Sequence, residues 1–162
     1  MEWTKETLQK PMWKEEIKNR EAKERVAKKM AERVQNGDVI GFGSGSTSYL
    51  TAIEIAKKIQ TEHLNIIAIP TSYEIKMLCT YLEIPTATLE EKKPDWCFDG
   101  ADEVDHDNWM IKGRGAAMFN EKLNIKSSNK TYILVDESKI VNRLGSKFPV
   151  PVECTPKAIN LV

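Results

Sequence analysis

Several features that would assign a chain to a common protein class are missing from this sequence. Its three cysteines, Cys79, Cys97 and Cys154, are scattered and form no Cys-x-x-Cys pair, so we expect neither a disulfide framework nor a zinc site. No apolar run approaches the roughly 20 residues of a membrane-spanning helix, and the start lacks the pattern of a signal peptide. We therefore expect a cytoplasmic protein with reduced thiols and no membrane partner.

An excess of charge of one sign is also missing, because 24 Lys and Arg residues balance 24 Asp and Glu residues. A net charge of zero gives no reason to expect a nucleic-acid partner. The only two histidines, His63 and His106, have no companion at ligand spacing, and the acidic run 102–107 lacks the glycine and closing glutamate of a calcium loop. We expect no metal, no cofactor and no histidine-based catalytic triad.

What is present is typical of one globular domain. The chain has 162 residues, of which 41% are hydrophobic and 30% charged. We expect residues 1–20 to form an extension whose tryptophans, Trp3 and Trp13, pack on a surface, and residues 21–148 to form the main domain. The last residues are apolar and read like an interrupted helix, so residues 149–162 are interpreted as the start of a truncated C-terminal domain.

Apolar periodicity predicts strands that alternate with helices. The predicted strands cover residues 39–43, 64–69, 84–89, 96–98 and 131–135, and the predicted helices cover residues 22–34, 46–59, 72–82 and 140–144, with a further helix that starts near Ala116. Such alternation favours an α/β fold, a mostly parallel, Rossmann-like sheet with helices on both faces. In a sheet of this kind, ligands bind beyond the carboxyl ends of the strands.

A loop rich in glycine and hydroxyl groups follows the first strand and reads Gly43-Ser44-Gly45-Ser46-Thr47. Strand, loop and helix start in succession form an anion site, because free N–H groups and the positive end of the helix dipole converge there. No Gly-Lys-Ser/Thr follows, and Ser48 stands where a dinucleotide loop has its third glycine. A small phosphate ester is therefore favoured over a nucleotide, and over an ordinary helix cap without a ligand.

The richest stretch in polar chemistry runs from Asp99 to Glu121. It holds Asp99-Gly100-Ala101-Asp102 directly after an apolar strand, then Lys112-Gly113-Arg114-Gly115, and then Glu121. Carboxylates and a lysine on loops at strand ends suit proton transfer better than core packing. The alternatives are that Asp99 and Asp102 only form turns, and that Glu121 and, later in the chain, Lys139 are surface charges.

Taken together, these motifs resemble the A-type ribose-5-phosphate isomerases. The resemblance extends from about Lys23 to the C-terminus, and it is carried by Gly43–Thr47, Asp99–Glu103, Lys112–Ala117, Glu121–Lys122, Asp136–Lys139 and Lys147–Glu153. It implies interconversion of ribose 5-phosphate and ribulose 5-phosphate through an enediol, without a metal or cofactor. It also implies a small-molecule substrate as partner and a homodimer or homotetramer.

By position, the resemblance implies a role for each matching residue. Glu121 would be the base that moves a proton between C2 and C1, and Lys112 would stabilise the enediolate. Asp99 and Asp102 would hold sugar hydroxyls and assist ring opening. The phosphate would lie on Ser44, Gly45, Ser46 and Thr47, with Lys139 and Lys23 beside it, and the remaining substrate contacts would come from Gly100, Ala101, Gly113, Arg114 and Gly115.

Two departures from the family pattern leave alternatives open. Many relatives carry glycine where this chain has Arg114, and members continue beyond the point at which this sequence ends. A non-catalytic sugar-phosphate sensor domain, or an inactive fragment of the isomerase, is the main alternative. Half of a coenzyme A transferase, which would use a glutamate as nucleophile, is a third possibility.

Overall fold

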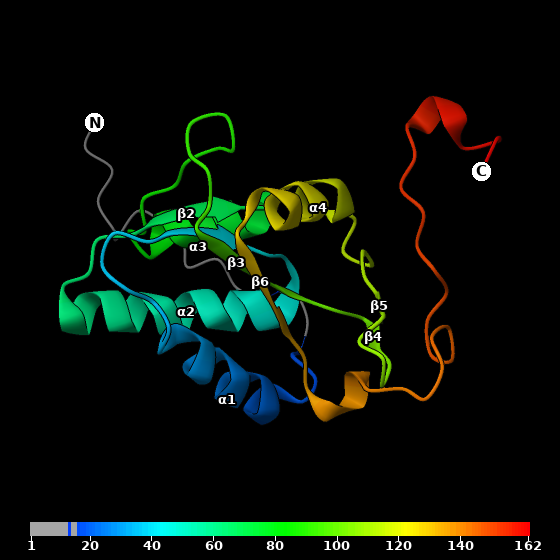
Figure 1. The fold of residues 1–162 in the computed structure, drawn as a ribbon, viewed down its shortest axis with the longest axis horizontal. Helices are drawn as coiled ribbons and strands as arrows, with labels where there is room; N and C mark the ends of the chain where they lie inside the picture. Colours follow the sequence, from blue (N-terminus) through cyan, green and yellow to red (C-terminus); the bar gives the residue numbers. More distant parts are fainter. Residues whose placement is uncertain (1–12, 14–15) are drawn as a thin grey trace.

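The computed structural model describes residue 13 and residues 16–162, and a four-stranded sheet forms its centre (Figure 1). The strands lie in the order β2-β1-β3-β6, and every neighbouring pair is parallel. They span β1 Val39–Phe42, β2 Ile67–Pro70, β3 Trp96–Gly100 and β6 Lys130–Leu134. The predicted parallel α/β sheet is thereby confirmed.

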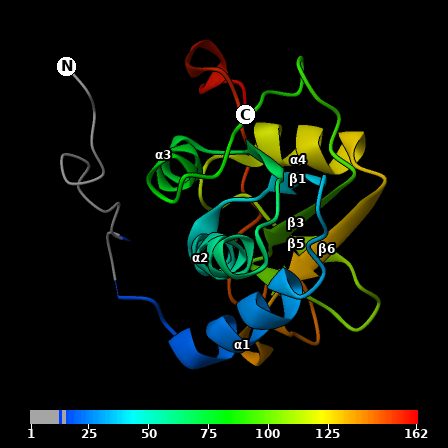
Figure 2. The same cartoon turned by 90° about the vertical axis from the view of Figure 1, so that its left-hand side faces the viewer.

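Helices cover both faces of this sheet, as predicted. The four α-helices are α1 Arg20–Ala31, α2 Gly45–Glu62, α3 Tyr73–Tyr81 and α4 Met118–Ser127. Figures 1 and 2 show α1 and α2 on one face of the sheet and α4 on the other. Ser72 caps α3 by accepting a hydrogen bond from the Ile75 N–H.

The hydrophobic core lies between the sheet and the α1–α2 layer. Ile40, Phe42 and Phe98 on the strands and Ile55 on α2 are all at most 1% exposed, and the rings of Phe42 and Phe98 pack 4.9 Å apart. Burial of each such side chain contributes about 1.5–3 kcal/mol. The core therefore fixes β1 against β3, and with them the two loops that follow these strands.

The opposite face is held by polar contacts of α4. Asn124 is 3% exposed and donates from Nδ2 to the Ile69 carbonyl at 2.8 Å, while Asn120 donates to the Thr71 carbonyl at 3.2 Å. A side chain at Gly41 would collide with Cys97 and crowd Asn124, so glycine lets α4 approach the sheet closely. These two hydrogen bonds thus fix the position of α4, the helix that carries Glu121, against the end of β2.

A short antiparallel ribbon, β4 Glu103–Val104 and β5 Met110–Ile111, was not predicted. Each of its strands has two residues, too few for an alternating pattern to be visible in the sequence. The ribbon turns the chain back, so that the loop after β5 lies beside the end of β3. Asp102 donates its N–H to the Ile111 carbonyl at 2.8 Å and closes this turn.

Two sequence predictions were wrong. Residues 84–89 form one isolated bridge to β2 and no strand, because Pro85 has no N–H to extend the pairing. Residues 140–144 form no helix, since the Val141 N–H pairs with the Val104 carbonyl, and the only helical turn nearby is η2 Glu137–Lys139. The helix predicted to start near Ala116 is α4, which begins at Met118 because Ala116 lies in the left-handed region with φ 56°.

The described residues at the two ends of the chain lie outside the central sheet. The prediction for Trp3 lies outside the described residues, whereas Trp13 packs on Tyr49 with ring centroids 5.6 Å apart and Ile17 joins the core. Residues 149–162, with the 3₁₀ turn η3 Pro156–Ala158, run outside the sheet in Figure 1. The domain boundaries proposed from the sequence stay predictions.

Over the part of the chain that is described, no helix has both the length and the apolar character needed to cross a membrane.

The contact between Asn124 and the Ile69 carbonyl makes a testable prediction. Asn124→Ala removes a buried side-chain hydrogen bond to the Ile69 carbonyl, so the free energy of unfolding should fall by about 1–1.5 kcal/mol. Lys122→Ala, on the exposed side of the same helix, should change it by about 0.5 kcal/mol or less. Urea unfolding of both variants measures the difference, and equal losses would contradict the role given to Asn124.

Candidate active site

The candidate site lies where the strand order reverses. The chain runs from β1 to β2 on one side and reaches β3 on the other side of β1, so the loops that follow β1 and β3 are neighbours at the carboxyl edge of the sheet. The Gly43 N–H donates to the Phe98 carbonyl at 2.8 Å and joins the two loops. An edge of this kind is the usual ligand position in open parallel sheets.

The loop after β1 leads into the N-terminus of α2. Ser44 is the N-cap residue, but its hydroxyl bonds to the Thr71 hydroxyl at 2.7 Å instead of capping the helix. Gly45 has φ 88°, a conformation that favours glycine. Among the described residues no side chain caps α2, so its first N–H groups are directed at the site with the positive end of the dipole.

Lysines stand beside this helix start. Lys23 on α1 is 8% exposed and donates from Nζ to Ser46 Oγ at 2.9 Å. Burial lowers the pKa of Lys23 most, Asp136 raises it, and the positive charge of Lys139 lowers it again, which places Lys139 within electrostatic reach. Two ammonium groups and the helix dipole therefore give this end of the site a positive character.

Asp99 ends β3 with its carboxylate turned into the site. It is 2% exposed, and Oδ1 accepts the N–H groups of Ser44 at 3.2 Å and Gly100 at 2.8 Å. A side chain at Gly43 would lie 2.3 Å from Oδ1, so this glycine is required for the close approach of the two loops. The carboxylate of Asp99 thus links the β1 loop to the β3 loop.

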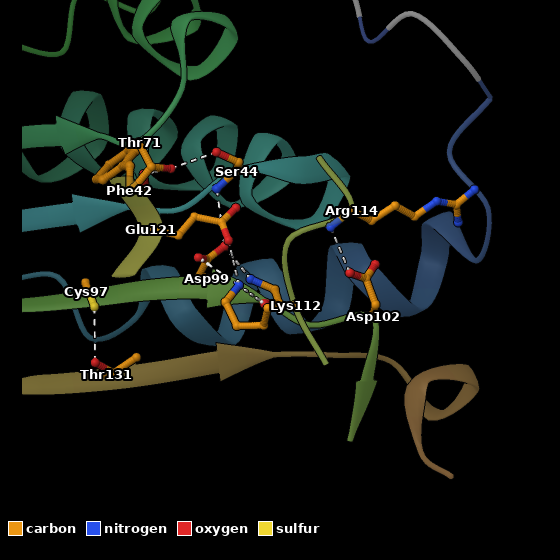
Figure 3. A network of polar contacts seen from close by, with 11 residues as sticks. Phe42, Ser44, Thr71, Cys97, Asp99, Asp102, Lys112, Arg114, Glu121 and Thr131 are labelled. Carbon is orange, nitrogen blue, oxygen red and sulfur yellow. Dashed lines mark hydrogen bonds and ion pairs between the residues drawn. The ribbon is translucent and has the colours of Figure 1, made fainter. Parts of the chain in front are cut away.

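Lys112 lies between two carboxylates, as Figure 3 shows. Its Nζ is 2.9 Å from Asp99 Oδ2 and 3.2 Å from Glu121 Oε2, and it donates to the Gly100 carbonyl at 2.6 Å. Burial acts to lower the pKa of Lys112, but the charges of Asp99 and Glu121 outweigh it and the pKa is raised. Lys112 is therefore held as a cation by two ion pairs and one hydrogen bond to a backbone carbonyl.

Burial favours the uncharged form of Asp99, which for a carboxyl group means a higher pKa. It raises the pKa of Asp99 to about 6 from an ordinary 3.8, against the charge of Lys112 and with the help of the charge of Glu121. Asp99 can consequently take up or release a proton near neutral pH. This property suits a group that exchanges protons with a ligand.

Glu121 lies in the first turn of α4 and is 5% exposed. A carboxylate in the first turn is stabilised by the helix dipole. The two asparagines of α4 described above hold this turn over the end of β2, and the Lys112 ammonium holds the carboxylate from the other side. Glu121 therefore lies at the same edge of the sheet as the loop that precedes α2.

The remaining predicted residues form the loop between β5 and α4. Asp102 Oδ2 accepts the backbone N–H of Arg114 at 3.2 Å, while Figure 3 shows the Arg114 guanidinium pointing away from Lys112. Gly113 has φ 103°, and a side chain there would collide with Met118 at 2.8 Å. Glycine is therefore needed at 113 to let the loop fold back over the site.

All the residues singled out in the sequence line one cavity of about 130 Å³: Lys23, Ser44, Gly45, Ser46, Thr47, Asp99, Gly100, Ala101, Asp102, Lys112, Gly113, Arg114, Gly115, Glu121 and Lys139. The structure thus brings every one of them together, whereas their roles stay predictions. Asp99 and Asp102 also accept backbone N–H groups, as the alternative interpretation of turn-forming residues expects, so both interpretations fit these contacts. No cluster of three or more metal-binding side chains occurs among the residues described.

Sequence reasoning missed several residues that support the site. Glu103 was noted only as part of an acidic block, yet it is fully buried and accepts N–H groups from Gly145, Lys147 and Phe148. Phe148 and Asn124 were not singled out for the site. Their partners lie far away in the chain, so no local spacing could have identified them.

Fold and site together define a class. A parallel α/β sheet with an uncapped helix start, a cluster of buried acids and a lysine at its carboxyl edge is the architecture of α/β proteins that bind small anionic ligands there. The sequence profile of the family described as Ribose 5-phosphate isomerase A (phosphoriboisomerase A) matches residues 67–162. The chain belongs to this family, and the resemblance seen in the motifs is confirmed.

Individual relatives agree with this assignment. Ribose-5-phosphate isomerase A of Methanocaldococcus jannaschii is 45% identical over 147 residues, which are 90% of this chain and 65% of the relative. The solved structure from the same organism has a TM-score of 0.85 at 44% identity and covers 88% of this chain and 64% of that one. A D-ribose-5-phosphate isomerase in complex with phospho-erythronic acid also has a TM-score of 0.85, at 37% identity, with 90% and 64% covered. The chain therefore spans slightly less than two thirds of the length of these relatives.

The raised pKa of Asp99 makes a prediction about stability. Because the native state binds the proton more tightly, the contribution of Asp99 is favourable below pH 3.8 and is lost as the pH rises through about 6. Relative to Asp99→Asn, the wild type should lose about 2 kcal/mol of unfolding free energy between pH 4 and pH 7. Urea unfolding of both proteins at several pH values measures this difference. A constant difference, or one that grows in favour of the wild type, would contradict the shift.

Proposed function

We propose that this protein interconverts ribose 5-phosphate and ribulose 5-phosphate through an enediolate intermediate. The observation that carries the proposal is the Lys112 ammonium held between the carboxylates of Asp99 and Glu121, in a cavity shared with the N-terminus of α2. Membership of the family supports it. The relative solved with phospho-erythronic acid supports a phosphorylated, sugar-like ligand.

Isomerisation of an aldose to a ketose needs a base that can serve two adjacent carbons. Glu121 removes the proton from C2 while the C1 carbonyl gains negative charge, and a C1–C2 double bond forms. Return of the proton to C1, with transfer of the O2 proton to O1, completes the ketose. A single carboxylate can perform both carbon steps if it lies between the two carbons. The buried position of Glu121 in a fixed helical turn suits this task.

The charge that develops on oxygen needs a fixed cation. Lys112 is held as a cation by its two acidic neighbours and is 17% exposed at its side chain, so its field is weakly screened. Asp99, with a pKa of about 6, and Asp102 are assigned to the sugar hydroxyls and to ring opening. Charge stabilisation and ring opening are thus both assigned to side chains of this protein.

The phosphate is assigned to the other end of the cavity. The N–H groups at the start of α2, the hydroxyls of Ser46 and Thr47, and the ammonium groups of Lys23 and Lys139 suit a dianion. Phosphate binding away from the reacting carbons supplies energy that orients C1 and C2 under Glu121. A homodimer or homotetramer, and a cytoplasmic location, stay predictions.

Glu121→Gln tests the assignment of the base. Loss of a general base should lower kcat for ribose 5-phosphate by at least about 100-fold, while binding measured by calorimetry should change only a few-fold because the cavity keeps its shape. Lys122→Gln, at the exposed neighbouring position, should keep wild-type activity.

The assay couples formation of ribulose 5-phosphate to a detectable product, with and without EDTA. Retention of activity in Glu121→Gln would refute the proposed base. Binding of ribose 5-phosphate without turnover in both the wild type and the variant would favour a sensor-type domain or an inactive fragment over the isomerase.

A further inference from the structure

Phe148 is an aromatic residue beside two of the cations that line the cavity. The guanidinium carbon of Arg114 lies 4.9 Å from the centre of the Phe148 ring, and Lys139 Nζ lies 5.3 Å from it. Both distances are within the roughly 6 Å range of a cation–π interaction. Phe148 thus contacts both cations without itself lining the cavity.

The position of the ring is fixed by a buried carboxylate. Glu103 is fully buried, and its oxygens accept N–H groups from Phe148 at 2.9 Å, Lys147 at 2.5 Å and Gly145 at 2.6 Å. Burial opposes ionisation of Glu103, but these hydrogen bonds and the Lys147 charge outweigh it and lower its pKa. The segment 145–148 is therefore anchored to β4, next to the Asp102 residue that holds the backbone of Arg114.

An aromatic ring has a particular advantage as a partner for these cations. A carboxylate at this position would bring Arg114 and Lys139 together but would cancel part of their charge. The ring attracts cations through its quadrupole and carries no net charge, so both groups keep their full charge and most of their N–H donors. Repulsion between the two cations is then balanced without reducing their affinity for an anion.

Arg114 and Lys139 both line the cavity, which agrees with a common anion site. Figure 3 shows the Arg114 guanidinium pointing away from the Asp99–Lys112–Glu121 cluster, so it does not serve the acidic end of the cavity. Lys139 is within electrostatic reach of Lys23, whose ammonium group bonds to Ser46 at the start of α2. Arg114 and Lys139 therefore extend the positive end of the cavity.

We propose that Phe148 is a positioning residue whose ring holds Arg114 and Lys139 for the phosphate group of the substrate. This inference rests on the proposed function for the identity of the substrate, but the anion site itself can be tested without turnover. In this assignment Arg114 takes part in phosphate recognition. Glu103 supports it indirectly, because it holds the backbone of Phe148 and the Phe148 ring contacts Arg114.

The chain contains a matched control ring. Tyr132 on β6 also has an arginine and a lysine over its ring, with Arg33 at 4.8 Å and Lys130 at 5.1 Å from the centroid. Tyr132 and its two cations are not part of the cavity lining. Tyr132→Leu therefore removes the same kind of interaction without touching the proposed anion site.

The experiment measures binding of inorganic phosphate by calorimetry, and kcat and KM for ribose 5-phosphate, on the full chain. Phe148→Leu should raise the Kd for phosphate and the KM by about five- to tenfold, the factor expected from two exposed cation–π contacts, with kcat changed less than about twofold. Phe148→Tyr should restore both values, and Tyr132→Leu should leave both unchanged.

Trifluorophenylalanine at position 148 separates positioning from packing, because it weakens the ring quadrupole while nearly keeping the shape of the ring. It also replaces Phe148→Leu as the test if that variant does not fold. A rise of the phosphate Kd on fluorination supports the proposal, whereas an unchanged Kd overturns it. Failure of the wild type to bind phosphate also overturns it. Phosphate binding that depends on the ring, in a wild type that does not turn over ribose 5-phosphate, refutes the proposed function and supports this inference.

Discussion

The contact of one ammonium group with two buried carboxylates is the interaction on which the site depends. Lys112, Asp99 and Glu121 come from three different elements, the ends of β5 and β3 and the first turn of α4, and each is mostly buried. Buried charges are tolerated when they are paired and hydrogen-bonded. Removal of any one of them would leave the other two in an environment that does not solvate them. The same contacts that pair these charges also bring together a base (Glu121), a cation (Lys112) and a titratable acid (Asp99).

The surrounding structure can be understood as support for this contact. The packing of Phe42 against Phe98 fixes β1 beside β3, and Gly43 lets the β1 loop reach the Asp99 carboxylate. The amide of Asn124 registers α4 on β2. Lys23 and the start of α2 then add a positive region at the same edge of the sheet. The site therefore separates into an acidic end suited to proton transfer and a cationic end suited to an anion.

The parts that the sequence predicted share a physical reason. The loop Ser44–Thr47 has a local signal, glycines and hydroxyls between a strand and a helix, and the order of strands and helices then places it beside Asp99 by a general rule of parallel sheets. Lys112 and Glu121 were singled out because they follow the strand end at Asp99 in a stretch rich in glycine and charge, and their separate roles came from the resemblance to a family motif. The parts that were missed depend on distant partners: Glu103 binds residues more than 40 positions away, Asn124 binds Ile69, and the two-residue strands β4 and β5 are too short for a pattern. Neither composition nor periodicity contains this information.

The most direct test of the central claim follows hydrogen at C2 of the sugar. The protein is incubated with ribose 5-phosphate in D₂O through many turnovers, and proton NMR follows the C2–H signal as the aldose and ketose equilibrate. While the enediolate is bound, the Glu121 carboxyl carries the abstracted proton and can exchange it with solvent, so over many turnovers the account predicts that the C2–H signal disappears. Equilibration of the two sugars with the C2 proton fully retained would contradict proton transfer through Glu121 and with it the mechanism proposed for this site.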